Sequence, residues 1–189
     1  MQIIKEISDW MTSIIVAFVV ALFVNAFLFQ PTKVQGNSME PTLQNNNYLL
    51  VSKILHTLRK VPEYEEIVII DSRVKRERNI KDDLIDPMNT YLAVTRLGNT
   101  EPDRHIWVKR IIGKPGDTIE FSDSNVYRNG KLLDEPYIKE KMHSNSSQKI
   151  IIPENYVFVM GDNRNNSNDS RIIGVVPVSH ILGKVVFKI

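Results

Sequence analysis

One stretch near the N-terminus limits the possible architectures of this 189-residue chain more than any other feature. Residues 10–29, WMTSIIVAFVVALFVNAFLF, contain no charged side chain. As a helix, such a stretch rises about 30 Å, which matches the hydrocarbon core of a bilayer. A cleavable signal peptide is the alternative, with Val24-Asn25-Ala26 as a small-x-small cleavage site. Because the apolar run is longer than the usual ~7–15 residues and continues past Ala26, we expect an uncleaved transmembrane anchor.

Composition excludes several classes of function. The net charge of +2 is small for this length, so nucleic-acid binding is not indicated. The chain contains no cysteine, which excludes disulfides, thiolate metal sites and cysteine nucleophiles. Its four histidines are scattered without the spacing of metal ligands, so we expect no metal site.

The 160 residues after the anchor favour β-structure. Runs of β-branched and aromatic residues bounded by turn residues are typical of strands, and they occur at 48–54, 66–71, 90–97, 105–112, 156–160 and 181–189. Asn129-Gly130, within 125–133, predicts a hairpin because this dipeptide tolerates the positive φ angles of a type I′ turn. No second helix of clear period and no internal repeat is found, so we predict a mainly β domain.

Two polar segments are expected to be insertions. Residues 71–89 are highly charged and lack periodicity; their basic part would suit lipid headgroups, but a solvated loop is favoured. Residues 134–149 are polar and, with the hairpin, are expected to form a small subdomain. The predicted organisation is therefore an N-terminal segment (1–9), an anchor (10–29) and a main domain (30–189), with its core at 30–122 and 154–189 and an inserted subdomain at about 123–153.

Ser38, in VQGNSMEPTL (34–43), is a candidate nucleophile close to the membrane. A turn serine is the alternative, and the stretch is not the G-x-S-x-G of a nucleophile elbow. The chain between Phe29 and Ser38 extends at most about 30 Å, so this serine lies near the end of the anchor. A serine nucleophile needs a base. Neither His105 nor His180 lies in a sequence pattern typical of a catalytic histidine, so both are expected to be ordinary surface or half-buried residues.

Lys109 is the candidate base. In HIWVKRII, the period of a strand places Lys109 on the same face as Trp107 and Ile111. Most lysines beside apolar residues extend to water, but burial lowers the pKa of a lysine and allows it to accept a proton. The polar cluster GDNRNNSNDSR (161–171) directly follows an apolar strand. A polar loop is its ordinary interpretation, and its density of hydrogen-bonding groups also suits the support of a catalytic base.

Three stretches together resemble the type I signal peptidases, the membrane-bound Ser–Lys proteases that remove signal peptides from exported proteins. They are GNSMEPTL, VKRIIGKPGD and GDNRNNSNDSR, in the family's order behind an N-terminal anchor, and NNNYLLVSK is a weaker fourth match. The short length and single anchor look like the Gram-positive branch. The resemblance implies a β-rich signal-peptidase/LexA-like catalytic domain. Charge counting leaves the orientation open, and the resemblance implies a single-pass cell-membrane protein with a cytoplasmic N-terminus and an extracellular catalytic domain.

The resemblance also implies roles for individual residues. Ser38 would be the nucleophile, its backbone N–H would contribute to the oxyanion hole, Lys109 would be the general base, and Ser167 would orient the lysine amine. A polar and ionic support around the site would be formed by Asp162, Asp169, Arg171 and Arg110. The family prefers small residues at the first and third positions before the cut, and the walls of the substrate pocket are expected to be Val34, Met39, Leu43 and Val108.

No metal or cofactor is expected for this chemistry. The implied partners are the signal peptides of exported preproteins, the lipid bilayer and nearby protein-export machinery, with no nucleic acid. The chain departs from the family pattern at Gly36, where some members carry a serine that donates to the oxyanion. It also has Asn46-Asn47 and Glu65-Glu66 where Gly-Asp is usual.

Two alternatives have different sequence requirements. A LexA-type self-cleaving repressor would share the fold, but this sequence shows no DNA-binding segment and carries an expected anchor. A catalytically silent, membrane-tethered β module that binds exported chains would not need Ser38, Lys109 and Ser167 together. Cleavage of a preprotein separates these possibilities.

Overall fold

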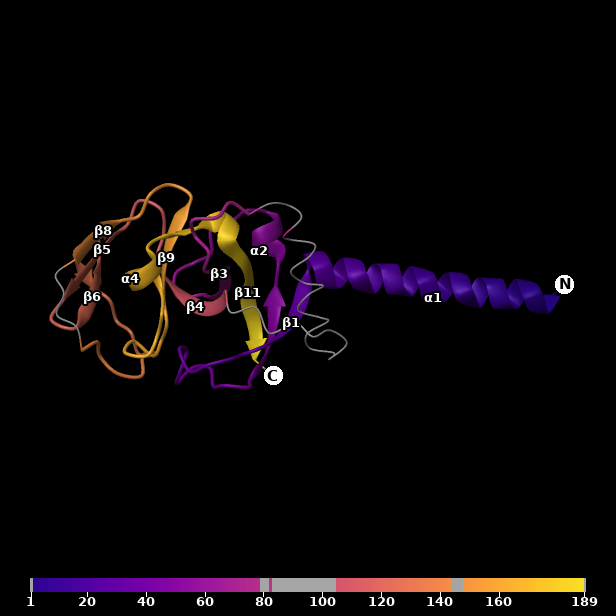
Figure 1. Cartoon of the computed structure of the whole chain (residues 1–189), viewed down its shortest axis with the longest axis horizontal. Coiled ribbons are helices and arrows are strands. Elements are labelled where there is room, and N and C mark those ends of the chain that lie inside the picture. The colour runs from indigo at the N-terminus through magenta and orange to yellow at the C-terminus, as the bar shows by residue number, and fades with distance from the viewer. Residues whose placement is uncertain (1, 79–81, 83–104, 144–147, 189) are drawn as a thin grey trace.

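The computed structural model describes residues 2–78, 82, 105–143 and 148–188. A long N-terminal helix, α1 (Gln2–Phe27), leads into a folded part made of two antiparallel sheets. Figure 1 shows α1 projecting away from both sheets, with the C-terminus of the described chain near the sheet that follows α1.

The larger sheet has seven strands in the order β1-β2-β11-β3-β4-β9-β10. The strands in chain order are β1 (Phe29–Lys33), β2 (Tyr48–Ser52), β3 (Ile67–Asp71), β4 (Ile106–Gly113), β9 (Tyr156–Met160), β10 (Val176–Pro177) and β11 (Ile181–Lys188). The last long strand, β11, lies between β2 and β3 and pairs with both, so it is a central strand of the sheet. Short helices among the described residues that connect strands are α2 (Ile54–Thr57), α4 (Ser170–Ile173) and the 3-10 helix η1 (Val178–His180).

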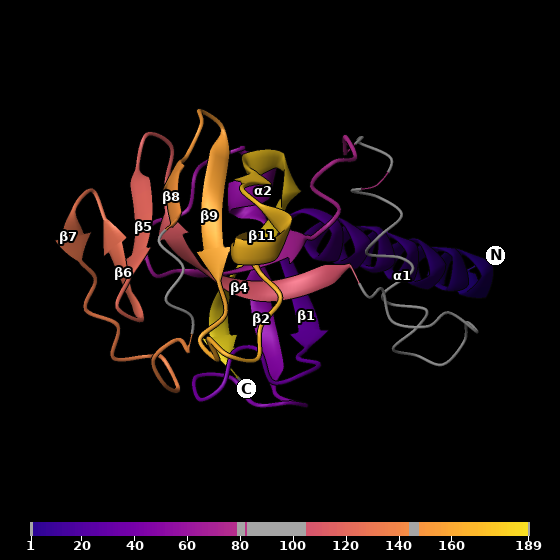
Figure 2. The ribbon, with the colours of Figure 1, turned by 60° about the vertical axis from the view of Figure 1, so that its left-hand side comes forward.

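The smaller sheet has four strands in the order β7-β6-β5-β8. They are β5 (Thr118–Ser122), β6 (Asn125–Arg128), β7 (Lys131–Leu132) and β8 (Gln148–Ile151). Figure 2 shows this sheet beside β9, on the side of the folded part away from α1.

The core lies on both faces of the larger sheet. Along β3, Val68 and Ile70 pack into one cluster with Val159 and Ile181, whereas Ile69 belongs to a second cluster under the loop after β1. A third cluster fills the junction with the smaller sheet, and its largest side chains are Phe121, Phe158, Met142 and Met160. Apolar burial on both faces explains why the central strands read as nearly continuous apolar runs.

Most of the predicted strands are confirmed, since the runs at 48–54, 66–71, 105–112, 156–160 and 181–189 form β2, β3, β4, β9 and β11. The run at 90–97 and most of the insertion at 71–89 lie outside the described residues. The predicted hairpin is β6–β7, with φ of +54° at Asn129 and +75° at Gly130, as a type I′ turn requires. The mainly β fold is therefore confirmed.

The expected anchor is not confirmed by the helix that forms there. Within the part of the chain that the structure describes, no helix is both long and apolar enough to cross a membrane. The 10–29 stretch is also not one element, because α1 ends at Phe27 and β1 begins at Phe29.

Candidate active site

Ser38 lies in the loop that joins β1 to β2. Gly36 begins the turn with φ of +88°, a left-handed conformation that glycine adopts at little cost. Backbone hydrogen bonds between Val34 and the Asn46–Asn47 turn close the base of the loop. Met39, directly after the serine, is 1% exposed and packs into the core. The loop is therefore fixed on both sides of Ser38, whose own side chain stays partly exposed.

Lys109 lies on β4, opposite Val68 of β3, and the fold brings it to Ser38. Its Nζ lies 2.8 Å from Ser38 Oγ and 3.0 Å from the backbone oxygen of Val108. The Nζ also lies 5.5 Å from the centre of the Trp107 ring. Only 3% of the lysine is exposed. The two candidate catalytic groups, 71 residues apart in sequence, are thus in hydrogen-bond contact.

Burial lowers the pKa of Lys109 from 10.5 to about 8. Desolvation is the largest cause, and the positive charge of Arg171 acts in the same direction. The carboxylates of Asp169 and Asp162 favour the protonated amine and limit the decrease. The arrangement therefore gives a lysine that is partly neutral near neutral pH, as a general base must be.

Asp162 joins β4 to the loop that carries Ser38. It accepts two hydrogen bonds from Arg110, at 2.8 Å from Nε and 2.6 Å from Nη2, and a third from Thr42 Oγ1 at 2.6 Å. Arg110 Nη1 donates to the backbone oxygen of Glu65 at 2.7 Å. Asp162 is completely buried and Arg110 is 8% exposed, so this is an internal ion pair with its hydrogen-bonding groups largely satisfied.

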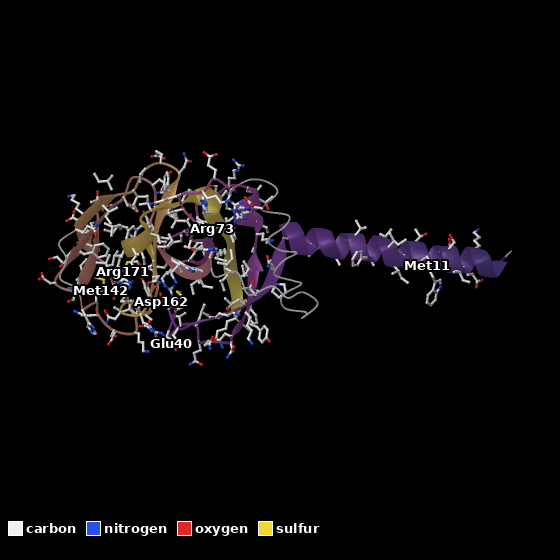
Figure 3. All side chains as sticks on the ribbon, in the orientation of Figure 1. Met11, Glu40, Arg73, Met142, Asp162 and Arg171 are labelled. Atoms are coloured by element: carbon white, nitrogen blue, oxygen red, sulfur yellow. The ribbon has the colours of Figure 1, made fainter. Side chains whose placement is uncertain are left out.

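Asp169 connects the start of α4 to the end of β9. It caps the N-terminus of α4, and its Oδ2 accepts a hydrogen bond from the backbone N–H of Gly161 at 3.0 Å. Arg171 donates to both of its carboxylate oxygens, at 2.8 and 2.7 Å. The ionic support that the resemblance implies thus consists of two separate pairs, which hold two ends of the 161–171 loop. Figure 3 shows Asp162 and Arg171 near the junction of the two sheets, far from Met11 of α1.

Ser167 lies beside the loop that carries Ser38, and Gly161 makes this approach possible. A Cβ atom on Gly161 would lie 2.5 Å from the backbone oxygen of Ser38 and would also collide with Ser167 Oγ. The hydroxyl oxygen of Ser167 is buried and has no hydrogen-bond partner among the described residues. Asn163 completes the junction, since its backbone N–H donates to Ser38 O at 3.0 Å and its Nδ2 donates to Asn37 O at 3.1 Å.

Sequence reasoning assigned no role to four side chains of this network: Thr42, Asn163, Arg164 and Glu135. Thr42, Asn163 and Arg164 stand inside the quoted motifs, so their place in those motifs was the available signal. Glu135 and its pairing with Arg164 have no local signal, because the two residues lie 29 residues apart and meet only in the folded chain.

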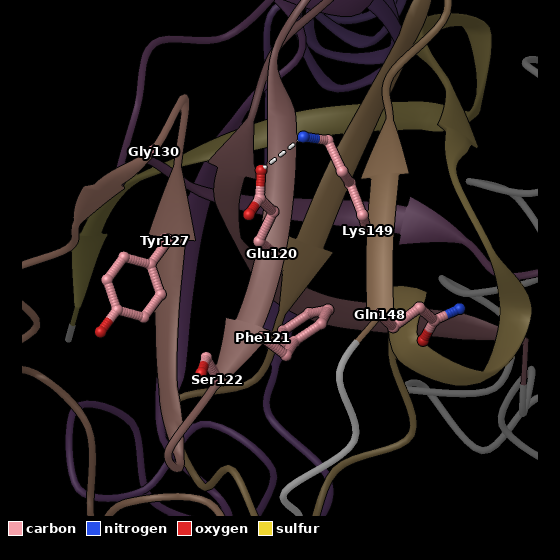
Figure 4. A pocket seen from close by; sticks show the side chains of 7 residues that line it. All are labelled: Glu120, Phe121, Ser122, Tyr127, Gly130, Gln148 and Lys149. Atoms are coloured by element: carbon pink, nitrogen blue, oxygen red, sulfur yellow. Dashed lines mark ion pairs between the residues drawn. The ribbon is translucent and has the colours of Figure 1, made fainter.

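The expected pocket residues lie next to the site but are largely covered. Val34, Met39 and Leu43 are at most 3% exposed and pack in one core cluster, and Val108 packs against that cluster. Their role as walls of a substrate pocket stays a prediction. A hollow on the smaller sheet, shown in Figure 4, is lined instead by Glu120, Phe121, Ser122, Tyr127, Gly130, Gln148 and Lys149.

His180, which sequence reasoning took for a surface or half-buried residue, is 2% exposed. Its Nε2 is 2.8 Å from the backbone oxygen of Arg76. Burial lowers the pKa of this imidazole. This imidazole thus contacts the segment after β3 and not Ser38.

Comparison with known proteins gives consistent matches. Residues 7–189 match the family described as signal peptidase, peptidase S26. A signal peptidase I from Bacillus licheniformis is 35% identical over 95% of this chain and 86% of the relative. Signal peptidase IB from Staphylococcus aureus is 29% identical over 97% and 90%. A crystal structure of a signal peptidase I from Enterococcus faecalis is 25% identical, with a TM-score of 0.44, over 67% of this chain and 98% of that one.

Proposed function

We propose, since this chain belongs to the peptidase S26 family of signal peptidases, that it cleaves with Ser38 as nucleophile and Lys109 as general base. The activity itself follows from the family: the chain is a serine endopeptidase of the signal peptidase I type that removes signal peptides from preproteins. The observation that carries the proposed dyad is the 2.8 Å contact between Lys109 Nζ, on a buried strand, and Ser38 Oγ.

In the proposed reaction, neutral Lys109 takes the proton from Ser38 Oγ as this oxygen attacks the scissile carbonyl carbon. The protonated amine then donates to the leaving amine, which gives an acyl-enzyme and the mature protein. In the second half, neutral Lys109 takes a proton from a water molecule as the water oxygen attacks the ester carbon. The bond from this carbon to Ser38 Oγ then breaks, the lysine ammonium returns the proton to Oγ, and the signal peptide leaves with a free carboxyl group. The pKa of about 8 supports this cycle because the amine can both lose and regain a proton at neutral pH.

The remaining polar residues are proposed to hold this pair in place. The hydroxyl of Ser167, which has no hydrogen-bond partner in the described part of the chain, is assigned to the orientation of the lysine amine. The Asp162–Arg110 and Asp169–Arg171 pairs are assigned to fixing the loops on either side of it. Gly36 carries no hydroxyl, so the developing oxyanion would be stabilised by backbone donors, including the N–H of Ser38.

Substrate selection is proposed to follow the family preference for small side chains at the first and third positions before the cut. An extended peptide would pair with strand edges and present alternate side chains to the enzyme. The walls are assigned to Val34, Met39, Leu43 and Val108. Their tight packing favours shallow pockets, which would accept small residues and exclude large ones.

The N-terminal segment is proposed to anchor the enzyme to the cell membrane. Support comes from the uncharged stretch at 10–29 and from the exposed apolar side chains of α1, such as Ile14 and Phe18, which are 60% and 63% exposed. In this arrangement residues 1–9 lie in the cytoplasm and 30–189 form an extracellular catalytic domain. The subdomain predicted at about 123–153 would correspond to β6, β7 and β8 of the smaller sheet, which also includes β5 from the range predicted as core. The export machinery would deliver preproteins nearby.

Cleavage of one preprotein by the detergent-solubilised full chain tests this function. We expect the wild type to release the mature protein, and Ser38→Ala or Lys109→Ala to release none. Lys109→Arg should also be inactive, since a guanidinium stays protonated. The matched control is Lys114→Ala, which removes a lysine five residues further along the chain, in an ion pair with Glu63 at 2.7 Å; it should cleave normally. Substantial turnover by Lys109→Ala would refute the dyad, and an intact preprotein with the wild type would favour the catalytically silent module.

A further inference from the structure

A glutamate outside the matched motifs forms the most buried link between the smaller sheet and the 161–171 loop. Glu135 lies three residues after the end of β7. Its two carboxylate oxygens accept hydrogen bonds from Arg164 Nη1 at 2.7 Å and Nη2 at 2.6 Å. The two side chains are 7% and 1% exposed. The geometry is the bidentate fork that gives strong and directional recognition.

Arg164 connects Glu135 to the backbone of Gly161. While its terminal nitrogens are held by Glu135, its Nε donates to the backbone oxygen of Gly161 at 3.1 Å. The N–H of Gly161 donates to Asp169, one of the carboxylates that act on the pKa of Lys109. Gly161 also lies close to the backbone of Ser38, since a Cβ atom added to it would be 2.5 Å from Ser38 O, so its position bears on both proposed catalytic residues.

A second chain of contacts leads from the same glutamate to Arg110. Tyr137 donates its hydroxyl hydrogen to Glu135 Oε1 at 3.0 Å. The guanidinium carbon of Arg110 lies 4.0 Å from the centre of the Tyr137 ring. Arg110 in turn donates two hydrogen bonds to the carboxylate of Asp162. The N–H of Lys139 also donates to the backbone oxygen of Asp162 at 3.1 Å. The 135–139 segment thus holds consecutive residues 161 and 162 at the end of β9.

We infer that Glu135 is a positioning residue for the hydrolytic reaction. Through the fork to Arg164, it fixes the backbone of Gly161 and with it the distance between Ser38 and Lys109. This inference rests on the proposed Ser38–Lys109 chemistry. A buried ion pair contributes little net stability compared with apolar residues of similar size. Misplacing reacting groups by about 1 Å, by contrast, reduces turnover by about a hundredfold.

The test compares variants by their steady-state rates on one preprotein and by their thermal stability. Glu135→Gln keeps the shape of the side chain but loses the charge; we expect kcat to fall by about ten- to a hundredfold and KM to stay within about twofold. Glu120→Gln is the matched control, because Glu120 forms an exposed ion pair with Lys149 at 2.9 Å on the same small sheet. Its kcat, KM and Tm should match those of the wild type.

A charge exchange separates positioning from a purely structural ion pair. Glu135→Arg combined with Arg164→Glu restores the ion pair, but a carboxylate cannot donate to the oxygen of Gly161. We therefore expect the exchange to recover most of the decrease in Tm seen in Glu135→Gln. Its kcat should stay at least about tenfold below that of the wild type. If the exchanged protein does not fold, Arg164→Lys decides the question, since it keeps the charge and lacks the Nε donor. That variant should show low kcat with a KM within about twofold of the wild type.

Two results would overturn the inference. One is a kcat within about twofold of the wild type in Glu135→Gln or Arg164→Lys. The other is a recovery of kcat together with Tm in the exchanged protein. Ser38→Ala is measured in parallel: residual turnover there would refute the proposed dyad, whereas an inactive Ser38→Ala beside a fully active Glu135→Gln would refute the positioning role alone.

Discussion

At the scale of single residues, Lys109 is the side chain whose burial is unfavourable for folding but needed for the proposed function. Removing an ammonium group from water is unfavourable, and here this effect lowers the pKa to about 8. The nearby aspartates, Asp169 and Asp162, offset only part of the desolvation. The chain thus contains a lysine whose burial destabilises the fold, and the same burial gives the proposed base a neutral fraction near neutral pH.

This conflict predicts that Lys109→Met stabilises the protein at pH 7. Below pH 8 the lysine is protonated in the folded and the unfolded state, so its full cost is present; above about 10.5 it is neutral in both and the cost disappears. A shift of this size corresponds to at most about 3 kcal/mol. Denaturant unfolding of both proteins at pH 7 and pH 10 measures the difference. A methionine variant that is less stable than the wild type at pH 7 would contradict the predicted cost.

The central pair of residues could be predicted from the sequence, whereas the contacts around it could not. Strand periodicity placed Lys109 on an apolar face, and a short motif singled out Ser38. The hydrogen bond from Thr42 to Asp162 and the two from Asn163 to the Ser38 loop depend on how distant segments pack. Local propensity carries no information about such contacts. The deep burial of His180 was missed for the same reason.

At the scale of elements, the turn after β9 brings the site together. β9 ends at Met160, and Gly161 and Asp162 follow at once, one next to the Ser38 backbone and the other paired with Arg110. The strand is fixed by its antiparallel register with β4, in which Arg110 lies opposite Met160. The register of two neighbouring strands therefore sets the distance between the proposed base and its support.

Gly161→Ala is predicted to inactivate the enzyme while the β fold remains. A Cβ atom there would lie 2.5 Å from Ser38 O and 2.7 Å from Ser167 Cβ, so the two loops must separate. We expect kcat to fall by about a hundredfold or more, because the reacting groups lose alignment. Far-ultraviolet circular dichroism and preprotein cleavage, measured on the same sample, check this. Gly130→Ala, in the β6–β7 turn, serves as a control for a glycine substitution away from the site. A near-normal kcat in Gly161→Ala would contradict the prediction, because it would show that the two loops tolerate separation.

The elements missed by sequence reasoning have identifiable physical reasons. β1 contains Pro31, which lacks an N–H group and suits only an edge strand, and it follows directly on a helix. β5 was not marked because TIEFS shows a short and weak alternation. The helices α2 and α4 have four residues each, too few to show a helical period. In contrast, Asn129-Gly130 predicted its hairpin because turn chemistry is local.

At the scale of the whole molecule, the chain combines a projecting helix with two sheets that share a core. The third apolar cluster joins them, since Phe121 of the smaller sheet packs near Phe158 of the larger one, with ring centres 6.0 Å apart. The smaller sheet therefore contributes to the packing behind β9. The 135–139 segment, which follows β7, contacts the candidate active site through the hydrogen bond from Lys139 to Asp162, and Figure 2 shows the smaller sheet on the side of the folded part away from α1.

Retention in the membrane is the prediction that belongs to this scale. If α1 and its uncharged stretch anchor the enzyme, the full chain should stay with the membrane fraction after alkaline carbonate extraction. The double variant Val16→Glu with Val20→Glu should be released, because each charge at mid-bilayer costs about 2.5–3.5 kcal/mol. Val16→Leu with Val20→Leu is the matched control. Release of the wild-type chain by carbonate would exclude an integral anchor.

The pH dependence of kcat/KM for preprotein cleavage by the wild-type chain tests the Ser38–Lys109 dyad without any substitution. Only the neutral amine can take the proton, so kcat/KM should rise about tenfold per pH unit at acid pH. It should then level off above about pH 8, the pKa to which burial lowers Lys109. A profile that is flat from pH 6 to 10, or one that levels off near the ordinary histidine pKa of about 6.5, would contradict a lysine base.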